Sequence, residues 1–201
     1  MSLPRLNYVL TDGIKKVLDR NLYVSDSSSN TIRKVVVATR AVTTLAGTAG
    51  SFGTTDALGA AARFNRPAGV ALDGAGNLYV ADSSNHTIRK VAVATGAVTT
   101  LAGAGGLYGS ADGPGATARF DGPIGVATDG AGSLYVADMG NGTVRRVQLA
   151  NGSVTTLVGV AGQKGVKLGQ PPAGLNQPRA LTALATGEVI ILDENVVLSA
   201  R

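Results

Sequence analysis

The chain has 201 residues, a formal net charge of +5, no cysteine and a single histidine. The lack of cysteine excludes disulfides, thiolate chemistry and cysteine-ligated zinc sites. No apolar run approaches the roughly 20 residues of a membrane-spanning helix, and no basic run exceeds two residues, so we expect neither a membrane anchor nor an arginine-rich arm.

A unit of 56 residues recurs along the chain. The array consists of a half unit at 7–20, units at 21–76, 77–132 and 133–187, and a partial unit at 188–201. The first two full units share 38 identical positions when aligned without gaps, and the third diverges after Gly162. A fixed period of this kind is typical of repeat architectures, in which each unit is one supersecondary element. We therefore predict one array over residues 1–201.

Each unit contains four short apolar stretches that end in turn residues. In the clearest copy these stretches are 69–73, 78–82, 87–91 and 97–101. They are separated by glycine-, serine- and asparagine-rich turns, and none has a helical apolar period. This pattern predicts an all-β unit, a meander of four antiparallel strands joined by hairpins.

The first two strands of a unit are apolar on both faces. Leu78 and Val80 alternate with Tyr79 and Ala81 along the second strand, and successive side chains of a strand point to opposite faces. A single four-stranded sheet cannot bury both faces, whereas sheets stacked face to face can. We therefore expect each sheet to pack between two neighbours.

The repeated arginines have two predicted environments. The pairs Arg33-Lys34, Arg89-Lys90 and Arg145-Arg146 lie on the third strand, which we expect at the solvated rim. Arg63-Phe64 and Arg119-Phe120 precede a turn proline, and we expect the phenylalanine to be buried as a plug between adjacent sheets.

The segments RFNRPAGVALDGAGNLYVADSSNHTIRKV and RFDGPIGVATDGAGSLYVADMGNGTVRRV resemble the NHL repeat, and the resemblance extends over nearly the whole chain. It implies a β-propeller, in this family typically of six blades, each blade a four-stranded antiparallel sheet. The Asn-His pair of the motif is complete only at Asn85-His86, so the histidine is not shared by the repeats.

The chain holds about three and a half such blades. An open arc would expose two apolar blade faces, which favour aggregation. Three ways of covering them are open: two chains complete one ring, the chain is a fragment or an engineered piece of a larger propeller, or it closes as an unusual ring of four blades. We favour self-association, because a stable product must bury those faces.

An aspartate closes the second strand of each unit. These residues are Asp26, Asp82, Asp138 and Asp193. A ring of carboxylates could bind a metal ion, but a metal site rarely needs one identical ligand per blade. We predict instead that each carboxylate caps the following Ser/Asn turn through backbone amides, and we expect no metal and no cofactor.

Catalytic signatures are weak in this sequence. Propeller lyases and hydrolases that resemble this fold use several histidines or a carboxylate cluster around a metal, and one histidine cannot supply such a set. No nucleophile elbow or phosphate-binding loop is present, because no G-x-S-x-G and no Gly-Lys-Ser/Thr occurs. We therefore expect a protein that is not an enzyme.

The loops between blades and between the second and third strands form the candidate binding face. Its candidate residues are Arg63, Arg66, Asn85, His86, Tyr108 and Arg119. The first hypothesis is a scaffold that binds a protein partner through this face, an inference from fold geometry. The alternatives are an RNA-binding propeller that uses the basic residues of the same face, and, less favoured, a propeller lyase or hydrolase. The first ten residues lack a signal-peptide core, which leaves the compartment open.

Overall fold

The computed structural model describes residues 14–18, 21–167, 169, 174–184, 186–194 and 196–200. Within them the chain forms four antiparallel sheets, here called blades 1 to 4, as the repeat predicts. The half unit at 7–20 provides β1, the first strand of blade 1, and its residues 7–13, 19 and 20 lie outside the described residues.

The strands of the first two blades have these bounds: β1 Ile14–Leu18, β2 Asn21–Asp26, β3 Thr31–Val36, β4 Ala41–Ala46, β5 Pro67–Leu72, β6 Asn77–Asp82, β7 Thr87–Ala92 and β8 Ala97–Ala102. Those of the last two blades are β9 Pro123–Thr128, β10 Ser133–Asp138, β11 Thr143–Gln148, β12 Val154–Val158, β13 Pro178–Ala183, β14 Val189–Asp193 and β15 Val196–Ala200. The predicted strands of the clearest copy are confirmed to within two residues at each end. Blade 4 has three described strands, in line with its partial unit.

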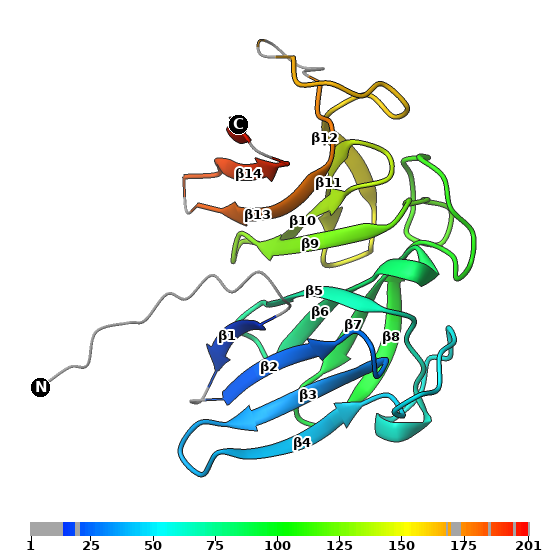
Figure 1. The fold of residues 1–201 in the computed structure, drawn as a ribbon, viewed down its shortest axis with the longest axis vertical. Coiled ribbons are helices and arrows are strands. Elements are labelled where there is room, and N and C mark those ends of the chain that lie inside the picture. Colours follow the sequence, from blue (N-terminus) through cyan, green and yellow to red (C-terminus); the bar gives the residue numbers. More distant parts are fainter. Residues whose placement is uncertain are drawn as a thin grey trace, which may run out of the picture.

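Helical structure in the described residues is limited to two 3-10 turns, η1 (Gly59–Ala61) and η2 (Ser83–Asn85). No helix among these residues is long and apolar enough to cross a membrane. The four sheets stand side by side in an open arc, with blades 1 and 4 at its two ends (Figure 1). The described chain is thus not a closed four-bladed ring.

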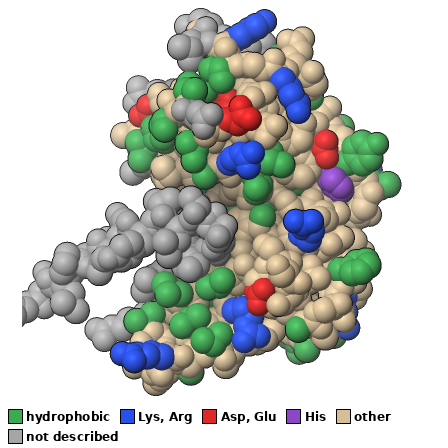
Figure 2. Space-filling view, viewed as in Figure 1, with side chains coloured by type: hydrophobic (Ala, Val, Ile, Leu, Met, Phe, Trp, Pro, Cys, Tyr) green, Lys and Arg blue, Asp and Glu red, His purple; other side chains and the backbone are tan. Residues whose placement is uncertain are grey.

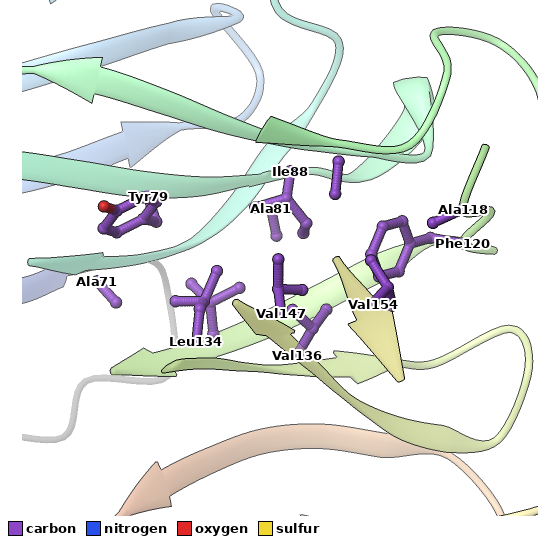
Figure 3. Close-up of a cluster of buried hydrophobic side chains, with 12 residues drawn as sticks. Ala71, Tyr79, Ala81, Ile88, Ala118, Phe120, Leu134, Val136, Val147 and Val154 are labelled. Atoms are coloured by element: carbon purple, nitrogen blue, oxygen red, sulfur yellow. The ribbon is translucent and has the colours of Figure 1, made fainter. Parts of the chain in front are cut away.

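Three hydrophobic clusters hold the arc together, one at each junction between adjacent blades. At the junction of blades 2 and 3, Tyr79 and Ala81 pack against Leu134 and Val136 (Figure 3). The alternate residues of β6 face the other way and join the cluster shared with blade 1. Burial of a Val or Leu side chain contributes about 1.5–3 kcal/mol. Strands that are apolar on both faces, as inferred from the sequence, therefore stabilise the stack of sheets.

The innermost strands approach one another at two glycines. A Cβ atom on Gly69 of β5 would lie 2.4 Å from the carbonyl oxygen of Ile124, and one on Gly125 of β9 would lie 2.7 Å from that of Arg179. Such separations are too short for a real Cβ atom. Both positions therefore require glycine because the next blade's backbone occupies the space.

Candidate functional site

One edge of the arc carries the links between blades together with the hairpin turns that join the second and third strands. We call it the loop face; it comprises residues 27–30, 47–66, 83–86 and 103–122, and Figure 1 shows its two links at the right, in cyan and green. Each link rests on the turn of the preceding blade. The amide of Gly50 donates to the carbonyl of Ser29 at 3.2 Å, and that of Gly106 donates to Asn85 at 3.1 Å.

A buried arginine anchors the first link to blade 2. The guanidinium of Arg89 donates to the carboxylate of Asp82 at 2.8 Å and to that of Asp56, in the link, at 2.5 Å. It also donates to the carbonyls of Arg63 at 2.9 Å and Thr55 at 3.1 Å. Four charge-assisted hydrogen bonds therefore join a strand, a turn and a link, and we call this arrangement the arginine clamp.

The clamp recurs at the next junction. Arg145 donates to Asp138 at 2.9 Å, to Asp112 at 2.6 Å, and to the carbonyls of Arg119 and Ala111 at 3.0 Å each. Arg89 and Arg145 are both 0% exposed. The prediction that the third-strand basic pairs lie at a solvated rim is therefore wrong for these two arginines, because each finds four oxygen acceptors in the junction.

The phenylalanine of each Arg-Phe pair lies beneath the clamp, as expected for a plug between blades. Phe64 and Phe120 are both 0% exposed. The guanidinium carbon of Arg89 stands 5.2 Å from the centre of the Phe64 ring, and that of Arg145 stands 5.4 Å from Phe120. A cation over an aromatic face adds stabilisation where water is excluded.

Burial dominates the acid–base behaviour of the clamp carboxylates. It raises the pKa of Asp82 to about 6, against the opposing hydrogen bonds from the Asn65 amide, Asn85 and Arg89. Burial likewise raises the pKa of Asp138 to about 6. Perturbed carboxylates often mark active sites, but here enclosure within the blade junction accounts for the shift.

The four repeated aspartates have different partners. Asp26 accepts the amide of Ser29 at 3.3 Å, as predicted for a turn cap. For Asp82 and Asp138 the predicted backbone caps are wrong, because the following turn reaches each carboxylate through the side-chain amide of Asn85 or Asn141. The turn after Asp193 includes residue 195, which lies outside the described residues. Asp82 and Asp138 bind the clamp arginine and a link amide, and Asp193 accepts the amides of Asn176 and Gln177. Among the described residues, no three acidic or histidine side chains are grouped so that they could hold a metal ion.

Three of the predicted binding residues use their side chains within the protein. Arg63 donates to the carbonyls of Ala60 and Ala62 at 2.6 and 2.7 Å. Arg119 makes the equivalent bonds in the second link. Asn85 is buried and donates to Asp82 at 2.7 Å. The loop face therefore carries fewer free cations than the sequence suggested.

His86 and Tyr108 lie together on the loop face. Their ring centres are 5.8 Å apart, and Nδ1 of His86 accepts the amide of Gly122 at 3.0 Å. The carboxylate of Asp121 is 3.6 Å from the same nitrogen. Figure 2 shows the histidine, in purple, at the surface beside hydrophobic and acidic side chains. His86 thus fastens one blade's turn to the next link.

Sequence reasoning missed a second exposed aromatic residue. Phe52 is 72% exposed, and Tyr108 is 73% exposed. The two residues are 56 positions apart. The backbone of each forms an isolated parallel β-bridge with the buried phenylalanine of its own link. The repeat period was the signal that could have identified Phe52 once Tyr108 had been selected.

A polar hollow opens on the loop face where blade 1 meets the first link. It measures about 330 Å³ and is lined by Ser27, Ser28, Asn30, Asn65 and Arg66. The amide of Arg66 donates to the side-chain oxygen of Asn30 at 2.8 Å, which closes one wall. The side chain of Arg66 is exposed. Of the six predicted residues, Arg66 is the one that contributes a cation to this hollow.

Comparison with known proteins identifies the repeat. A family model described as the NHL repeat matches residues 64–91. The chain is 34% identical over 160 residues to the chloroplastic protein SUPPRESSOR OF QUENCHING 1 of Arabidopsis thaliana, a match that covers 76% of this chain and 15% of the relative. It is 36% identical over 144 residues to NHL repeat-containing protein 2 of Homo sapiens, covering 68% of the chain and 20% of the relative. The chain spans a small part of these relatives.

Solved structures share the fold. A protein of unknown function from Bacteroides thetaiotaomicron matches with a TM-score of 0.70 and 23% identity, covering 87% of this chain and 42% of that one. Virginiamycin B lyase from Staphylococcus aureus matches with a TM-score of 0.57 and 14% identity, covering 93% of this chain and 54% of that one. At these identities the matches establish the propeller architecture alone.

Proposed function

Because the chain belongs to the NHL-repeat family, we propose that it is a non-enzymatic β-propeller scaffold whose loop face binds a protein partner. The observation that carries this proposal is the pair of exposed aromatic residues, Phe52 and Tyr108, on neighbouring links. Aromatic side chains supply much of the binding energy in protein interfaces. Here each stands on a link that a buried clamp holds in place, so little order has to be gained on binding.

The same geometry favours a scaffold over the two alternatives. The carboxylates with raised pKa values, Asp82 and Asp138, are fully buried in blade junctions, where they bind the clamp arginines. Arg63 and Arg119 are bound to backbone carbonyls, which removes two cations from a surface that would follow a nucleic acid backbone.

A random peptide library displayed on phage tests the loop face. The wild-type protein is expected to enrich a peptide family, and the double variant Phe52→Ala, Tyr108→Ala is expected to lose it. Val37→Ala is the matched control, because Val37 is 49% exposed and lies in the turn between β3 and β4. Equal enrichment by the double variant would refute the proposal. Tight, salt-sensitive binding of single-stranded RNA in place of peptides would support the RNA alternative.

The two ends of the arc expose apolar positions that are buried within it. Val42 of β4 is 52% exposed, whereas Val98 and Val154, at the same place in blades 2 and 3, are 2% and 1% exposed. At the other end, Leu192 and Val197 are 36% and 67% exposed. We propose that the free face of blade 1 packs on the free face of blade 4 of a second copy, repeating the junction that the chain already forms three times within itself.

Light scattering with two single variants tests this pairing. Val42→Lys places a charge on the free face of blade 1, and Val197→Lys places one on the free face of blade 4. Each variant alone is therefore expected to stay at 20.1 kDa, the mass of one chain. Mixing the two is expected to restore one junction and a dimer, because each supplies the face that the other lacks. A wild-type protein that remains monomeric at all concentrations would refute self-association and assign those faces to other blades.

A further inference from the structure

The polar hollow beside blade 1 has one cation and no internal anion. Among the residues that the structure describes, no carboxylate forms an ion pair with Arg66. The hydroxyl of Ser27 donates to the carbonyl of Pro67, and Ser28 and Asn65 add further polar groups to the lining. The hydroxyl of Ser27 is thus used within the protein, and Arg66 is the lining residue whose charge has no ion-pair partner among the described residues.

Arg66 occupies a backbone conformation that favours glycine. Its φ is 51°, in the left-handed region, and the equivalent residue of the next repeat is Gly122, with a φ of 57°. A side chain in this region is strained. The backbone geometry itself thus needs no arginine, and the strain is retained at an exposed residue that lines the hollow.

The next repeat provides an internal comparison with opposite charge. There Asp121 stands where the hollow has Asn65, Gly122 stands where it has Arg66, and His86 stands where it has Asn30. The backbone is the same, since each turn residue accepts the amide of the equivalent link residue. Of these two junctions, only that of blades 1 and 2 has an arginine at this position.

An exposed aromatic residue, Phe52, lies on the link whose end lines the hollow. The amide of Gly50 donates to the carbonyl of Ser29, which holds the turn before Phe52 against the residues that line the hollow. In the next repeat the equivalent residues, His86 and Tyr108, have ring centres 5.8 Å apart. His86 and Tyr108 correspond to Asn30 and Phe52, so the repeat leads us to expect Phe52 near Asn30, which lines the hollow.

We propose that this hollow binds an acidic side chain of a peptide segment, with an adjacent apolar side chain of the same segment packing on Phe52. The inference rests on the proposed protein-binding loop face and names the chemistry that this face recognises. Arg66 donates to the carboxylate in a charge-assisted hydrogen bond. A single cation suits a single carboxylate better than a polyanion, because nucleic acids are bound by rows of cations.

The test uses a random twelve-residue peptide library on phage, followed by the selected peptides made with blocked termini, each with a Glu→Gln or Asp→Asn counterpart. On the wild-type protein we expect an acidic residue beside an apolar one. Removing the acid is expected to weaken binding about tenfold or more. Arg66→Gly is expected to bind the acidic and amide peptides equally, and Arg66→Glu to select basic peptides instead.

Arg40→Gly is the matched control. Arg40 is an exposed arginine in the left-handed region, with a φ of 59°, but it lies in the turn between β3 and β4. This variant loses the same charge and the same strain, and it is expected to keep the acidic preference. Arg66→Gly is expected to fold, because Gly122 adopts the same conformation.

The possible failures are distinct. Enrichment of apolar peptides without an acidic preference would overturn the hollow's assignment and leave the loop face standing as a binding surface. An acidic preference that survives in Arg66→Gly would also overturn the assignment. No enrichment of any peptide by the wild-type protein would overturn both proposals.

Discussion

Blades 1 and 2 begin with nearly the same sequence, yet the same arginine has a different role in each. Arg89 is enclosed in the clamp, whereas Arg33, which follows the same Thr-Ile in blade 1, is half-buried and donates to Thr44 at 2.6 Å. The acceptors of Arg89 come partly from the link that precedes blade 2. The comparison teaches that the clamp belongs to the junction between two blades and not to the blade itself.

In blade 4, too, the partners of the repeated aspartate depend on the junction. Leu198 stands opposite Ile191 in β14, the place where Arg145 stands opposite Val136 in blade 3. Without an arginine, the buried Asp193 is satisfied by two link amides. A buried carboxylate thus recurs in blades 2, 3 and 4, while its partners change with the junction.

The largest expected difference between blades 1 and 2 is the loss of stability when the arginine of the third strand is removed. Arg89→Met leaves Asp82 buried without its cation, and loss of one partner of a buried ion pair costs about 3–5 kcal/mol. Arg33→Met, in a half-exposed environment, is expected to cost less than about 1 kcal/mol. Urea unfolding of both variants at pH 7 measures the difference, and equal losses would show that the clamp does not stabilise the junction.

The clamp carboxylates should give the stability a pH dependence. Asp82 titrates near 3.8 when unfolded and at about 6 when folded. Between these values the folded state binds more protons, so the free energy of unfolding falls as pH rises from about 4 to about 7. One such carboxyl accounts for at most about 3 kcal/mol.

Asp82→Asn is the control for this dependence, because it removes one titrating group while keeping the shape of the side chain. Urea unfolding between pH 4 and pH 7 is expected to show a shallower slope for the variant than for the wild type. The loss caused by Arg89→Met is also expected to shrink at pH 5, where Asp82 is protonated. Identical slopes would contradict the raised pKa.

Truncation of equivalent valines should cost more stability at a junction between blades than on the free face of blade 1. Val98 is 2% exposed and Val42 is 52% exposed at the same place in their blades. Val98→Ala removes packed methyl groups and is expected to cost about 2 kcal/mol. Val42→Ala is expected to cost less than about 0.5 kcal/mol at concentrations where the chain is monomeric. A larger cost at high concentration would indicate that a second copy covers Val42.

An effect smaller than the loss at Val98 concerns a turn. Gly96 has a φ of 74°, and a Cβ atom there would lie 2.7 Å from the carbonyl oxygen of Leu45 in blade 1. Its blade 1 equivalent is Arg40, with a φ of 59°. Arg40→Gly is expected to raise the free energy of unfolding by about 0.5–1 kcal/mol, since it relieves the left-handed strain. Thermal unfolding checks the sign, and a fall would show that Arg40 makes a stabilising contact.

Much of the fold followed from local pattern. Alternation in β6 predicted that Tyr79 and Ala81 face one neighbour while Leu78 and Val80 face the other, and the clusters on both sides confirm it. The plug role of Phe64 was also apparent, because it recurs before a turn proline. These features depend on short-range periodicity, which a sequence displays directly.

The candidate site was harder to infer. Arg63 and Arg66 are three residues apart and look alike in sequence, but one guanidinium binds carbonyls of its own link and the other reaches solvent. Phe52 was missed because an aromatic residue in a glycine-rich link has no local signature of exposure. Orientation in a link depends on which turn it rests on, and that turn belongs to another part of the chain.

The sequence by itself determined the repeat, the four-stranded blade and the stacking of two-faced sheets, because strand alternation and turn chemistry act over a few residues. Tertiary structure alone decided that Arg89 is buried. Its acceptor Asp56 lies 33 residues away in sequence, and only the docking of a link on the next blade brings the two together. The same docking decided that the exposed Arg66 lines a polar hollow on the loop face, on the link that also carries the exposed Phe52.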